Sequence, residues 1–195
     1  MKYIDVKEVY NLLIPLFGIT LRKIEYSDLE KVALWRNNDI IRKFMNDRRK
    51  VNKQILTVWL NKVINSTNSL AFIILNNKNI PSGVLEFKNI NTVESSCEQG
   101  IFLAPEKIGT GLGTQITLYQ EYILNKLNIY TIYLNIRNSN SRNITFWNKL
   151  GATLCRKDSE FLLFKSEKEI RREKLRHIAY VLQKGEIWDS FFTKM

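Results

Sequence analysis

The sequence predicts a single α/β (α+β) domain, residues 1–195, built on a mixed central sheet of about seven strands with an antiparallel N-terminal meander and flanking helices. Length and composition support this, since 195 residues with 45% hydrophobic and 25% charged side chains fit one globular domain with a substantial core. Three apolar runs follow one another at hairpin spacing in the middle of the chain. Later apolar runs alternate with stretches of helical period.

The first half of the chain predicts one strand between helices, and then the meander. A short amphipathic pattern ends at Gly18, and Ser27 with Asp28 can cap the next helix. In order, the predicted elements are a helical N-terminal extension within 1–18 with its helix at 6–17, a strand at 19–24, a helix that carries Leu29, Val32, Ala33 and Trp35 on one face, a helix at 54–64, and strands at 70–75, 82–90 and 97–103.

The second half predicts alternating helices and strands. Residues 129–136 are almost all β-branched or aromatic, as in a buried strand flanked by helices, and Gly151 stands where a glycine closes a helix. Residues 176–183 show a strand pattern, which makes the segment before them an insertion that can shape a pocket or a dimer contact. In order, the predicted elements are a helix at 112–127, a strand at 129–136, a helix at 141–150, a strand from 152, an insertion at 157–175, a last strand at 176–183 and a tail at 184–195.

Basic residues outnumber acidic ones by 30 to 19, which gives a formal net charge of +11. Such a charge attracts polyanions, whether nucleic acid, acidic lipid or a small ligand that carries phosphates. Two denser basic stretches are residues 42–53 and 165–176, and the second interleaves Glu with its bases, as a solvated helix face does. A module that binds RNA or DNA is therefore a rival hypothesis, although no nucleic-acid motif accompanies the charge.

Several protein classes are excluded by what the sequence lacks. No apolar run reaches the roughly 18 residues of a membrane span, and the first residues lack the cleavage site of a secretory leader, so we expect a soluble, cytoplasmic protein without a membrane partner. Cys97 and Cys155 form no CxxC motif and His177 is the single histidine, so no metal site or disulfide framework is predicted. Both thiols are expected to be buried or half-buried apolar residues.

A glycine-rich stretch, EKIGTGLGTQITLYQ at residues 106–120, joins an apolar strand to a helix. Gly109, Gly111 and Gly113 leave main-chain N–H groups open at a helix N-terminus, where the helix dipole also favours a phosphate. A P-loop needs a Lys-Ser/Thr pair after the last glycine, and a dinucleotide fingerprint needs G-x-G-x-x-G in a parallel unit. Neither pattern is present, so the stretch predicts a pyrophosphate held after an antiparallel meander, with tight packing of the glycines as the alternative.

Two motifs at matching separation resemble those of the GNAT acetyltransferase family. APEKIGTGLGT is similar to that family's V-x-P-x-x-R/Q-G-x-G-I/L-G-x, and NSNSRNITFWNKLGA, at residues 138–152, is similar to its N-x-x-A-x-x-x-Y-x-K-x-G-F. The predicted order of elements is also that of the family, over about residues 19–183. The resemblance implies the family's fold and the transfer of an acetyl group from acetyl-CoA to an amine.

The resemblance also implies where coenzyme A lies. Its pyrophosphate would lie against main-chain N–H groups of residues 108–114. Its pantetheine arm would pair with the strand backbone at Phe102 and Leu103, which separates from the next strand near Asn135. Asn140 would bond the pantetheine or nearby backbone. The implied CoA-binding residues are Phe102, Leu103, Lys107, Ile108, Gly109, Thr110, Gly111, Leu112, Gly113, Thr114, Asn135, Asn140, Asn143 and Trp147.

Two residues depart from the family's pattern. Ile108 stands where a basic or amide side chain is common, so the grip on the pyrophosphate should come from main-chain N–H groups, with Lys107 close by. Trp147 stands where the family often has a tyrosine that protonates the leaving thiolate, and an indole N–H is a poor acid. Because a thiol has an unperturbed pKa of about 8.5, coenzyme A can leave as a thiolate. Catalysis is therefore expected mainly by positioning.

A finer resemblance concerns the acceptor. The segment ALWRNNDIIRKFM at 33–45, the later VWL, and the strands GVLEFKNIN and EQGIFL look like the branch that acetylates the 4-amine of nucleotide-linked deoxyamino sugars for surface polysaccharide or flagellin glycan synthesis, the pseudaminic-acid-pathway type. Arg48 or Arg49 would bind the sugar nucleotide's diphosphate. Plain core packing is the alternative for the tryptophans. The implied acceptor residues are Arg36, Asn37, Met45, Trp59 and Phe87.

An amine attacks a thioester only when it is neutral, so a base is needed near the acetyl group. Glu86 and Glu98 are the candidate catalytic residues, because both lie in otherwise apolar strands, where desolvation would raise the pKa of a lone carboxylate. Alternation puts Glu98 on the same face of its strand as Phe102, and Glu86 opposite Phe87. A solvent-facing strand edge is the alternative for each.

The sequence therefore predicts an acetyl-CoA-dependent N-acetyltransferase whose partner is a small nucleotide-sugar acceptor, with no nucleic acid, as a monomer or homodimer. Acetylation of a protein N-terminus, as by ribosomal-protein acetyltransferases, is the alternative with the same chemistry and would need an open peptide groove. A CoA-binding domain without activity is a further alternative, because of Trp147.

Overall fold

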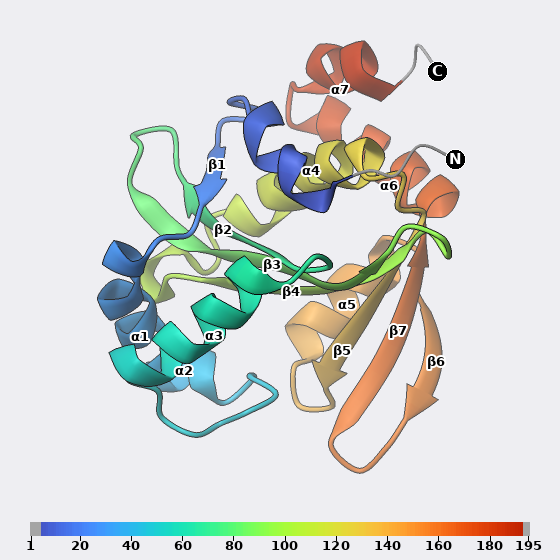
Figure 1. The fold of residues 1–195 in the computed structure, drawn as a ribbon. Helices are drawn as coiled ribbons and strands as arrows, with labels where there is room; N and C mark the ends of the chain where they lie inside the picture. Colours follow the sequence, from blue (N-terminus) through green and yellow to red (C-terminus); the bar gives the residue numbers. More distant parts are fainter. Residues whose placement is uncertain (1–4, 193–195) are drawn as a thin grey trace.

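A computed structural model describes residues 5–192, in which seven strands form one mixed sheet in the order β1-β2-β3-β4-β5-β7-β6 (Figure 1). Strands β1 to β4 pair antiparallel, β4 and β5 pair parallel, and β7 pairs antiparallel with both β5 and β6. The predicted fold class and meander are confirmed. The strands are β1 Thr20–Lys23, β2 Leu70–Leu75, β3 Pro81–Asn91, β4 Ser96–Leu103, β5 Thr131–Arg137, β6 Thr153–Lys157 and β7 Phe161–Glu167.

Helices cover both faces of this sheet (Figure 1). One apolar cluster joins α1 and α3 to Ala71, Ile73 and Val84, and a larger one joins α4, α5 and α6 to the opposite face. No helix among the described residues is long and apolar enough to cross a membrane. The helices are the 3-10 turns η1 Val6–Leu12, η2 Tyr26–Asp28 and η3 Pro105–Lys107, and α1 Leu29–Asn37, α2 Asp39–Arg42, α3 Lys53–Asn65, α4 Leu112–Lys126, α5 Ser141–Lys149, α6 Lys168–Val181 and α7 Gly185–Phe192.

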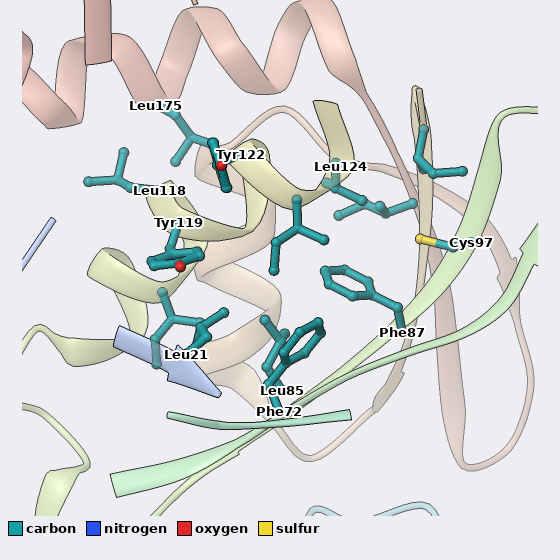
Figure 2. Close-up of a cluster of buried hydrophobic side chains, with 14 of the residues drawn as sticks. Leu21, Phe72, Leu85, Phe87, Cys97, Leu118, Tyr119, Tyr122, Leu124 and Leu175 are labelled. Atoms are coloured by element: carbon teal, nitrogen blue, oxygen red, sulfur yellow. The ribbon is translucent and has the colours of Figure 1, made fainter. Parts of the chain in front are cut away.

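The larger core lies between the sheet and α4 (Figure 2). Phe72 and Phe87 come from neighbouring strands, and their rings meet edge to face with centroids 6.3 Å apart. Both side chains are fully buried, and burial of one such side chain stabilises the fold by roughly 1.5–3 kcal/mol. Because side chains alternate along β3, the burial of Phe87 on this face turns Glu86 to the other one.

Strands β4 and β5 pair over only three residues each, Ser96–Glu98 against Thr131–Tyr133. Beyond them β4 stays paired with β3 as far as Leu103, whereas β5 turns away from β4 (Figure 1). On its other side β5 pairs with β7 along its whole length. The edge of β4 from residue 99 onward therefore has no strand partner on the β5 side. The sequence-based expectation that the two strands separate near Asn135 agrees with this register.

The C-terminal third differs from the sequence-based prediction. Residues 176–183, predicted as the last strand, are mostly the second half of α6, and the predicted insertion at 157–175 contains β7 and the start of that helix. Leu175 and Ala179, four residues apart, are buried, whereas their neighbours are largely exposed, which is helical spacing. An eight-residue run fits both periods, and the Lys- and Glu-rich residues before it favour a helix.

The chain ends are also more structured than predicted. The tail at 184–195 contains α7, whose Trp188 packs on Phe17 with ring centroids 6.5 Å apart, and residues 193–195 lie outside the described part. The helix predicted at 6–17 is η1 and stops at Leu12; residues 1–4 of the predicted extension lie outside the described part as well. The two ends of the described chain thus lie on the α4 side of the sheet (Figure 1).

Two local predictions are corrected by side-chain contacts. Asp28 does not cap α1 with its side chain, because its carboxylate pairs with Arg22 at 2.6 Å and accepts from Glu25 N at 2.9 Å. Cys155, predicted to be at least half-buried, is exposed on the edge strand β6, where a polar backbone edge faces solvent. Cys97 is buried as predicted, and burial raises the pKa of its thiol to about 12.

Candidate active site

The glycine loop, residues 105–114, connects β4 to α4. Gly109 and Gly111 have φ of 86° and 85°, in the left-handed region that glycine adopts without strain. Gly111 is the N-cap of α4, and the first N–H groups of a helix have no partner within it. A methyl group built on Gly111 or Gly113 would meet no atom within 4 Å. The start of α4 is therefore open, and it suits an anion such as a pyrophosphate.

Arg142 places a cation beside the glycine loop, which has an uncharged side chain at Ile108. A methyl group built on Gly109 would lie 3.6 Å from Arg142 Nη2, so the guanidinium stands beside the loop. Arg142 belongs to the first turn of α5, about thirty residues later in the chain, and it is exposed. Sequence reasoning missed this residue, because only the packing of α5 beside α4 brings it to the glycine loop.

Asn140 is the N-cap of α5, and its Oδ1 accepts a hydrogen bond from Asn143 N at 3.3 Å. This bond satisfies one of the free N–H groups of the helix, so Asn140 uses nearby backbone, one of the two roles implied by the resemblance. Trp147 is almost fully buried in the larger core, next to Phe146 at 5.7 Å between ring centroids. Trp147 faces the core and not the glycine loop, so its contact with coenzyme A stays a prediction of the resemblance.

The free edge of β4 runs through Phe102 and Leu103, whose other side pairs with Val84 and Gly83 of β3. Both side chains are half-buried. Asn135, on the facing strand, is exposed and pairs with β7. An extended ligand could therefore bond the main chain of β4 from the side where β5 has turned away, as the resemblance implies for the pantetheine arm.

Glu86 lies at the point where β4 and β5 separate. Trp59 Nε1, from α3, donates a hydrogen bond of 3.0 Å to Glu86 Oε1. The other oxygen, Oε2, would lie 3.7 Å from a methyl group built on Gly100, so no side chain from Gly100 covers that oxygen. Burial raises the pKa of Glu86, and the charge of Lys88 and the Trp59 hydrogen bond oppose part of this rise.

Glu98 shares the face of Glu86, because it is opposite Lys88 in the β3–β4 ladder, two residues further along β3. Its Oε1 accepts from Asn89 Nδ2 at 2.8 Å in an exposed contact. Glu86 is thus the more sequestered of the two predicted carboxylates. The predicted placement of Glu86 opposite Phe87 is confirmed by the burial of Phe87.

The segment between α2 and α3, residues 43–52, is called here the acceptor loop. Arg137, at the end of β5, donates from Nε to Met45 O at 2.7 Å and from Nη2 to Asn46 O at 2.8 Å. Asn37 binds both backbone groups of Val51, at 2.7 and 2.8 Å. These bonds hold the acceptor loop beside the end of β5. Arg137 is four residues after Tyr133, so both side chains lie on the same face of β5. Tyr133 is the β5 partner of Glu98, which shares the face of Glu86. The acceptor loop therefore borders the face of the sheet that carries Glu86.

The predicted acceptor residues fall into three groups. Arg36 and Asn37 support the acceptor loop, since an Arg36 guanidinium nitrogen bonds Asp47 O. Met45 is half-buried in that loop, and Trp59 contacts Glu86. Phe87 is wrongly predicted as an acceptor residue, because it is fully buried in the core on the opposite face.

A hollow of about 310 Å³ lies under the acceptor loop, lined by Asp39, Arg42, Lys43 and Arg48. Asp39 pairs with Arg42 at 2.5 Å, and outside the hollow Arg49 pairs with Asp47 at 2.7 Å. Of the two arginines predicted to bind a diphosphate, Arg48 lines the hollow and Arg49 does not. The hollow therefore presents more positive than negative charge.

The chain belongs to the GNAT acetyltransferases, because the model of the family described as an acetyltransferase (GNAT) domain matches residues 19–153. The chain is similar to the spermidine N(1)-acetyltransferase of Vibrio cholerae serotype O1, at 27% identity over 134 residues, which are 68% of this chain and 78% of that protein. Among solved structures, it resembles spermidine N-acetyltransferase from Vibrio cholerae in complex with CoA and spermine, with a TM-score of 0.70 and 20% identity over 79% of this chain and 98% of that one. A domain from Methanocaldococcus jannaschii matches with a TM-score of 0.66 and 22% identity, over 76% of this chain and 97% of the other.

The protein is thus an acyl-CoA-dependent N-acetyltransferase with acetyl-CoA as its cosubstrate. The predictions of the family, the reaction and the cosubstrate are confirmed. The two relatives from Vibrio cholerae are spermidine N-acetyltransferases, so they do not support the finer resemblance to enzymes of nucleotide-linked amino sugars.

Proposed function

We propose that this enzyme acetylates a primary amine of a small acceptor that carries negative charge, and that Glu86 removes the amine proton. The observation that carries the proposal is the position of Glu86 Oε2, uncovered beside Gly100 where β4 loses its partner β5. Acetyl-CoA supplies the acetyl group as a thioester.

Glu86 suits the removal of a proton from an ammonium group. Its raised pKa makes the carboxylate a better base than an exposed glutamate, while Trp59 fixes the direction of Oε1. One proton then passes from the ammonium nitrogen to Glu86 Oε2, and the free electron pair of the nitrogen attacks the thioester carbonyl carbon. The C–S bond breaks, coenzyme A leaves as the thiolate, and the second proton of the nitrogen passes to that thiolate to give the amide and the free thiol. General-base assistance of this kind contributes about 10²–10⁴-fold to a rate.

The leaving thiolate needs no strong acid from the protein. Trp147, which replaces the family's frequent tyrosine, is buried away from this face. A thiol with a pKa of about 8.5 leaves readily as the anion at neutral pH. Binding and orientation by the main chain of β4 and by the glycine loop therefore supply the rest of the catalysis.

The charge around the acceptor loop favours an anionic acceptor. Residues 43–52 contain four basic side chains and one acid. Arg36 Nη1 and Arg42 Nε are buried without a hydrogen-bond partner among the described residues, so an anion would satisfy donors that are otherwise unpaired. A nucleotide-linked deoxyamino sugar, with its amine and its diphosphate, fits this description.

A polyamine is the second candidate, and the names of the relatives support it. Glu86 and Glu98, on one face of the sheet, could bind a second ammonium group. Against it stand the cations of the acceptor loop, because like charges would repel a polycation. Net repulsion of this kind weakens with salt, so it is measurable.

One assay separates these candidates. Purified enzyme and acetyl-CoA are incubated with 4-amino and 3-amino deoxysugar nucleotides, with spermidine, or with a peptide that has a free N-terminus, and thiol release is measured. We expect release with a sugar nucleotide and its loss in Glu86→Gln. Release with spermidine alone would replace the anionic acceptor by the second candidate, and release with the peptide alone would overturn both.

A further inference from the structure

The N-terminal strap, defined here as residues 5–12, contacts elements on both sides of the sheet. Most of the strap is η1, and it precedes residues 19–153, the part of the chain that the family model matches. Val6 and Val9 are buried in the larger core, which also contains the apolar side chains of α4. The polar side chains of the strap bind α3 and β2 instead. The strap therefore connects the core to the elements that carry Trp59 and support Glu86.

Lys7 joins the end of α3 to the start of β2. Its Nζ donates two hydrogen bonds of 2.7 Å, one to Val63 O in the last turn of α3 and one to Ser69 O directly before β2. The last carbonyl groups of a helix have no partner within it and carry the negative end of its dipole, so an ammonium group suits this place. Partial burial and the charge of Lys23 lower the pKa of Lys7, and the charge of Asp5 opposes this change.

Tyr10 binds the edge of β2 at the point where β1 ends. The β1–β2 ladder stops one residue short of Ala71, whose carbonyl oxygen accepts a further bond of 3.3 Å from Ile24 N. The Tyr10 hydroxyl accepts from Ala71 N at 3.1 Å and donates to Ala71 O at 3.2 Å. Burial raises the pKa of Tyr10, so the hydroxyl keeps the proton that it donates. Tyr10 thus satisfies backbone groups that an uncovered strand edge would leave unpaired.

Both partners of the hydrogen bond between Trp59 and Glu86 are held in this way. Trp59 lies four residues before Val63, so the two side chains share one face of α3, and the ammonium bond fixes the turn that follows the indole. Ala71 is the β2 partner of Glu86, so the hydroxyl bonds fix the strand segment beside the carboxylate. A shift of either segment changes the geometry of the indole–carboxylate bond.

From these contacts we propose that Lys7 and Tyr10 are positioning residues for the acetyl transfer, which set the place of the Trp59 indole relative to the Glu86 carboxylate. The proposal rests on the proposed function, because it takes Glu86 as the base. Lys7 acts through the last turn of α3, and Tyr10 acts through the pairing of β2 with β3. A displacement of about 1 Å at a reacting group lowers a rate by up to about 10²-fold, so the support has a measurable effect.

The test measures kcat/KM against pH for Lys7→Met and Tyr10→Phe. Methionine keeps most of the aliphatic stem of Lys7, and phenylalanine keeps the ring of Tyr10. Lys62→Met is the matched control, because Lys62 is exposed in the last turn of α3 and its loss also removes a positive charge from that helix end. Circular dichroism and Tm monitor folding. The two test variants are independent, so one that does not fold leaves the other to decide.

We expect Lys7→Met to move the acid limb of the profile, the fall in kcat/KM toward low pH, to higher pH. A displaced indole no longer lowers the pKa of Glu86, whereas the charges of Lys88 and Glu98 that act on this carboxylate are the same in every variant. Tyr10→Phe should produce a smaller shift in the same direction. In both variants kcat should fall by about tenfold or more, with the KM for acetyl-CoA unchanged. Lys62→Met should leave the limb in place.

A double variant separates positioning from stability. When Trp59→Phe is already present, Lys7→Met should lower Tm and move the acid limb no further, because the bond that Lys7 positions is absent. A limb that moves in Trp59→Phe and stays at the wild-type pH in Lys7→Met and Tyr10→Phe would overturn this proposal alone. A limb that stays in place in Trp59→Phe as well would instead overturn Glu86 as the base, and with it the proposed function.

Discussion

Trp59 on α3 and Glu86 on β3 are joined by a hydrogen bond of 3.0 Å from the indole Nε1 to the carboxylate Oε1. The bond leaves Glu86 Oε2 beside Gly100, the one position of β4 near it that has no side chain. A helix that packs on one face of the sheet thereby orients a carboxylate at the point where two strands separate. The direction and the pKa of the Glu86 carboxylate therefore depend on how α3 packs on the sheet.

Glu86→Gln should lower kcat by about 10²–10³-fold and leave the affinity for acetyl-CoA unchanged, because the base is lost and the indole bond is kept. Steady-state kinetics with the acceptor identified above measures this. Glu98→Gln, on the same face, is the matched control and should retain most of the activity. Equal losses in the two variants would assign the base to neither residue.

Glu86→Gln should also stabilise the fold above neutral pH. The pKa of Glu86 is raised in the folded state, so the protonated carboxyl group is the form that the fold tolerates. Its contribution to the free energy of unfolding is fully present below the unfolded-state pKa and is lost as the pH rises through the folded-state pKa. Glutamine never ionises, so the variant's Tm should exceed that of the wild type at pH 8, and the difference should shrink toward pH 4. A lower Tm of the variant at pH 8 would contradict a desolvated carboxylate.

Trp59→Phe should move the acid limb of the rate profile to higher pH. The indole bond lowers the pKa of Glu86, so its removal raises that pKa further. The measurement is kcat/KM against pH, with Trp35→Phe, in the α1–α3 cluster, as the control for loss of an indole. If the acid limb of the kcat/KM profile stays at the same pH in Trp59→Phe, the titration of Glu86 does not determine that limb.

Gly113→Ala should weaken CoA binding at least tenfold without loss of stability. The residue lies in the first turn of α4 with open space around it, and alanine favours a helix over glycine by about 1 kcal/mol, so the added methyl meets the ligand and not the protein. Gly111→Ala should weaken binding and also destabilise the fold, because of the positive φ at that position. Lys107→Ala is the control. A larger loss of CoA affinity in Lys107→Ala than in Gly113→Ala would contradict the proposal that main-chain N–H groups hold the pyrophosphate.

Arg142→Ala should weaken CoA binding by about fivefold to tenfold, and the loss should shrink as salt is added, because the side chain is exposed. Asn148→Ala, also exposed on α5, is the matched control. Titration of each variant with CoA at two ionic strengths measures the loss of affinity and its dependence on salt. The same affinity for Arg142→Ala and Asn148→Ala would remove the guanidinium from the pyrophosphate site.

Arg137→Gln should raise the KM for the acceptor and leave that for acetyl-CoA unchanged. Its guanidinium holds the carbonyls of Met45 and Asn46, and without it the acceptor loop loses its bonds to β5. The reverse pattern, with a raised KM for acetyl-CoA only, would place the acceptor elsewhere.

The spacing of apolar residues and the positions of turn residues and glycines are enough to predict the meander, the glycine loop and the helix after it. The same reasoning failed for residues 176–183, because a short run fits strand and helix alike, and the buried pair of Glu121 and Arg171 that seats α6 joins residues fifty apart. Phe87 was misassigned for a related reason. Alternation gives the two faces of a strand, but it does not say which face the helices leave open.

The sequence by itself determined that a glycine-rich loop follows an antiparallel meander and that Glu86 and Glu98 stand in apolar strands, because these are local features of spacing and residue type. Only the tertiary structure decided that Glu86 is the more buried of the two carboxylates, that the Arg142 guanidinium lies beside the glycine loop, and that α6 walls a pocket next to that loop. Each of those outcomes depends on which segments, distant in the chain, pack together. The period of a helix or strand shows which of its faces is buried, but it does not show which element covers that face.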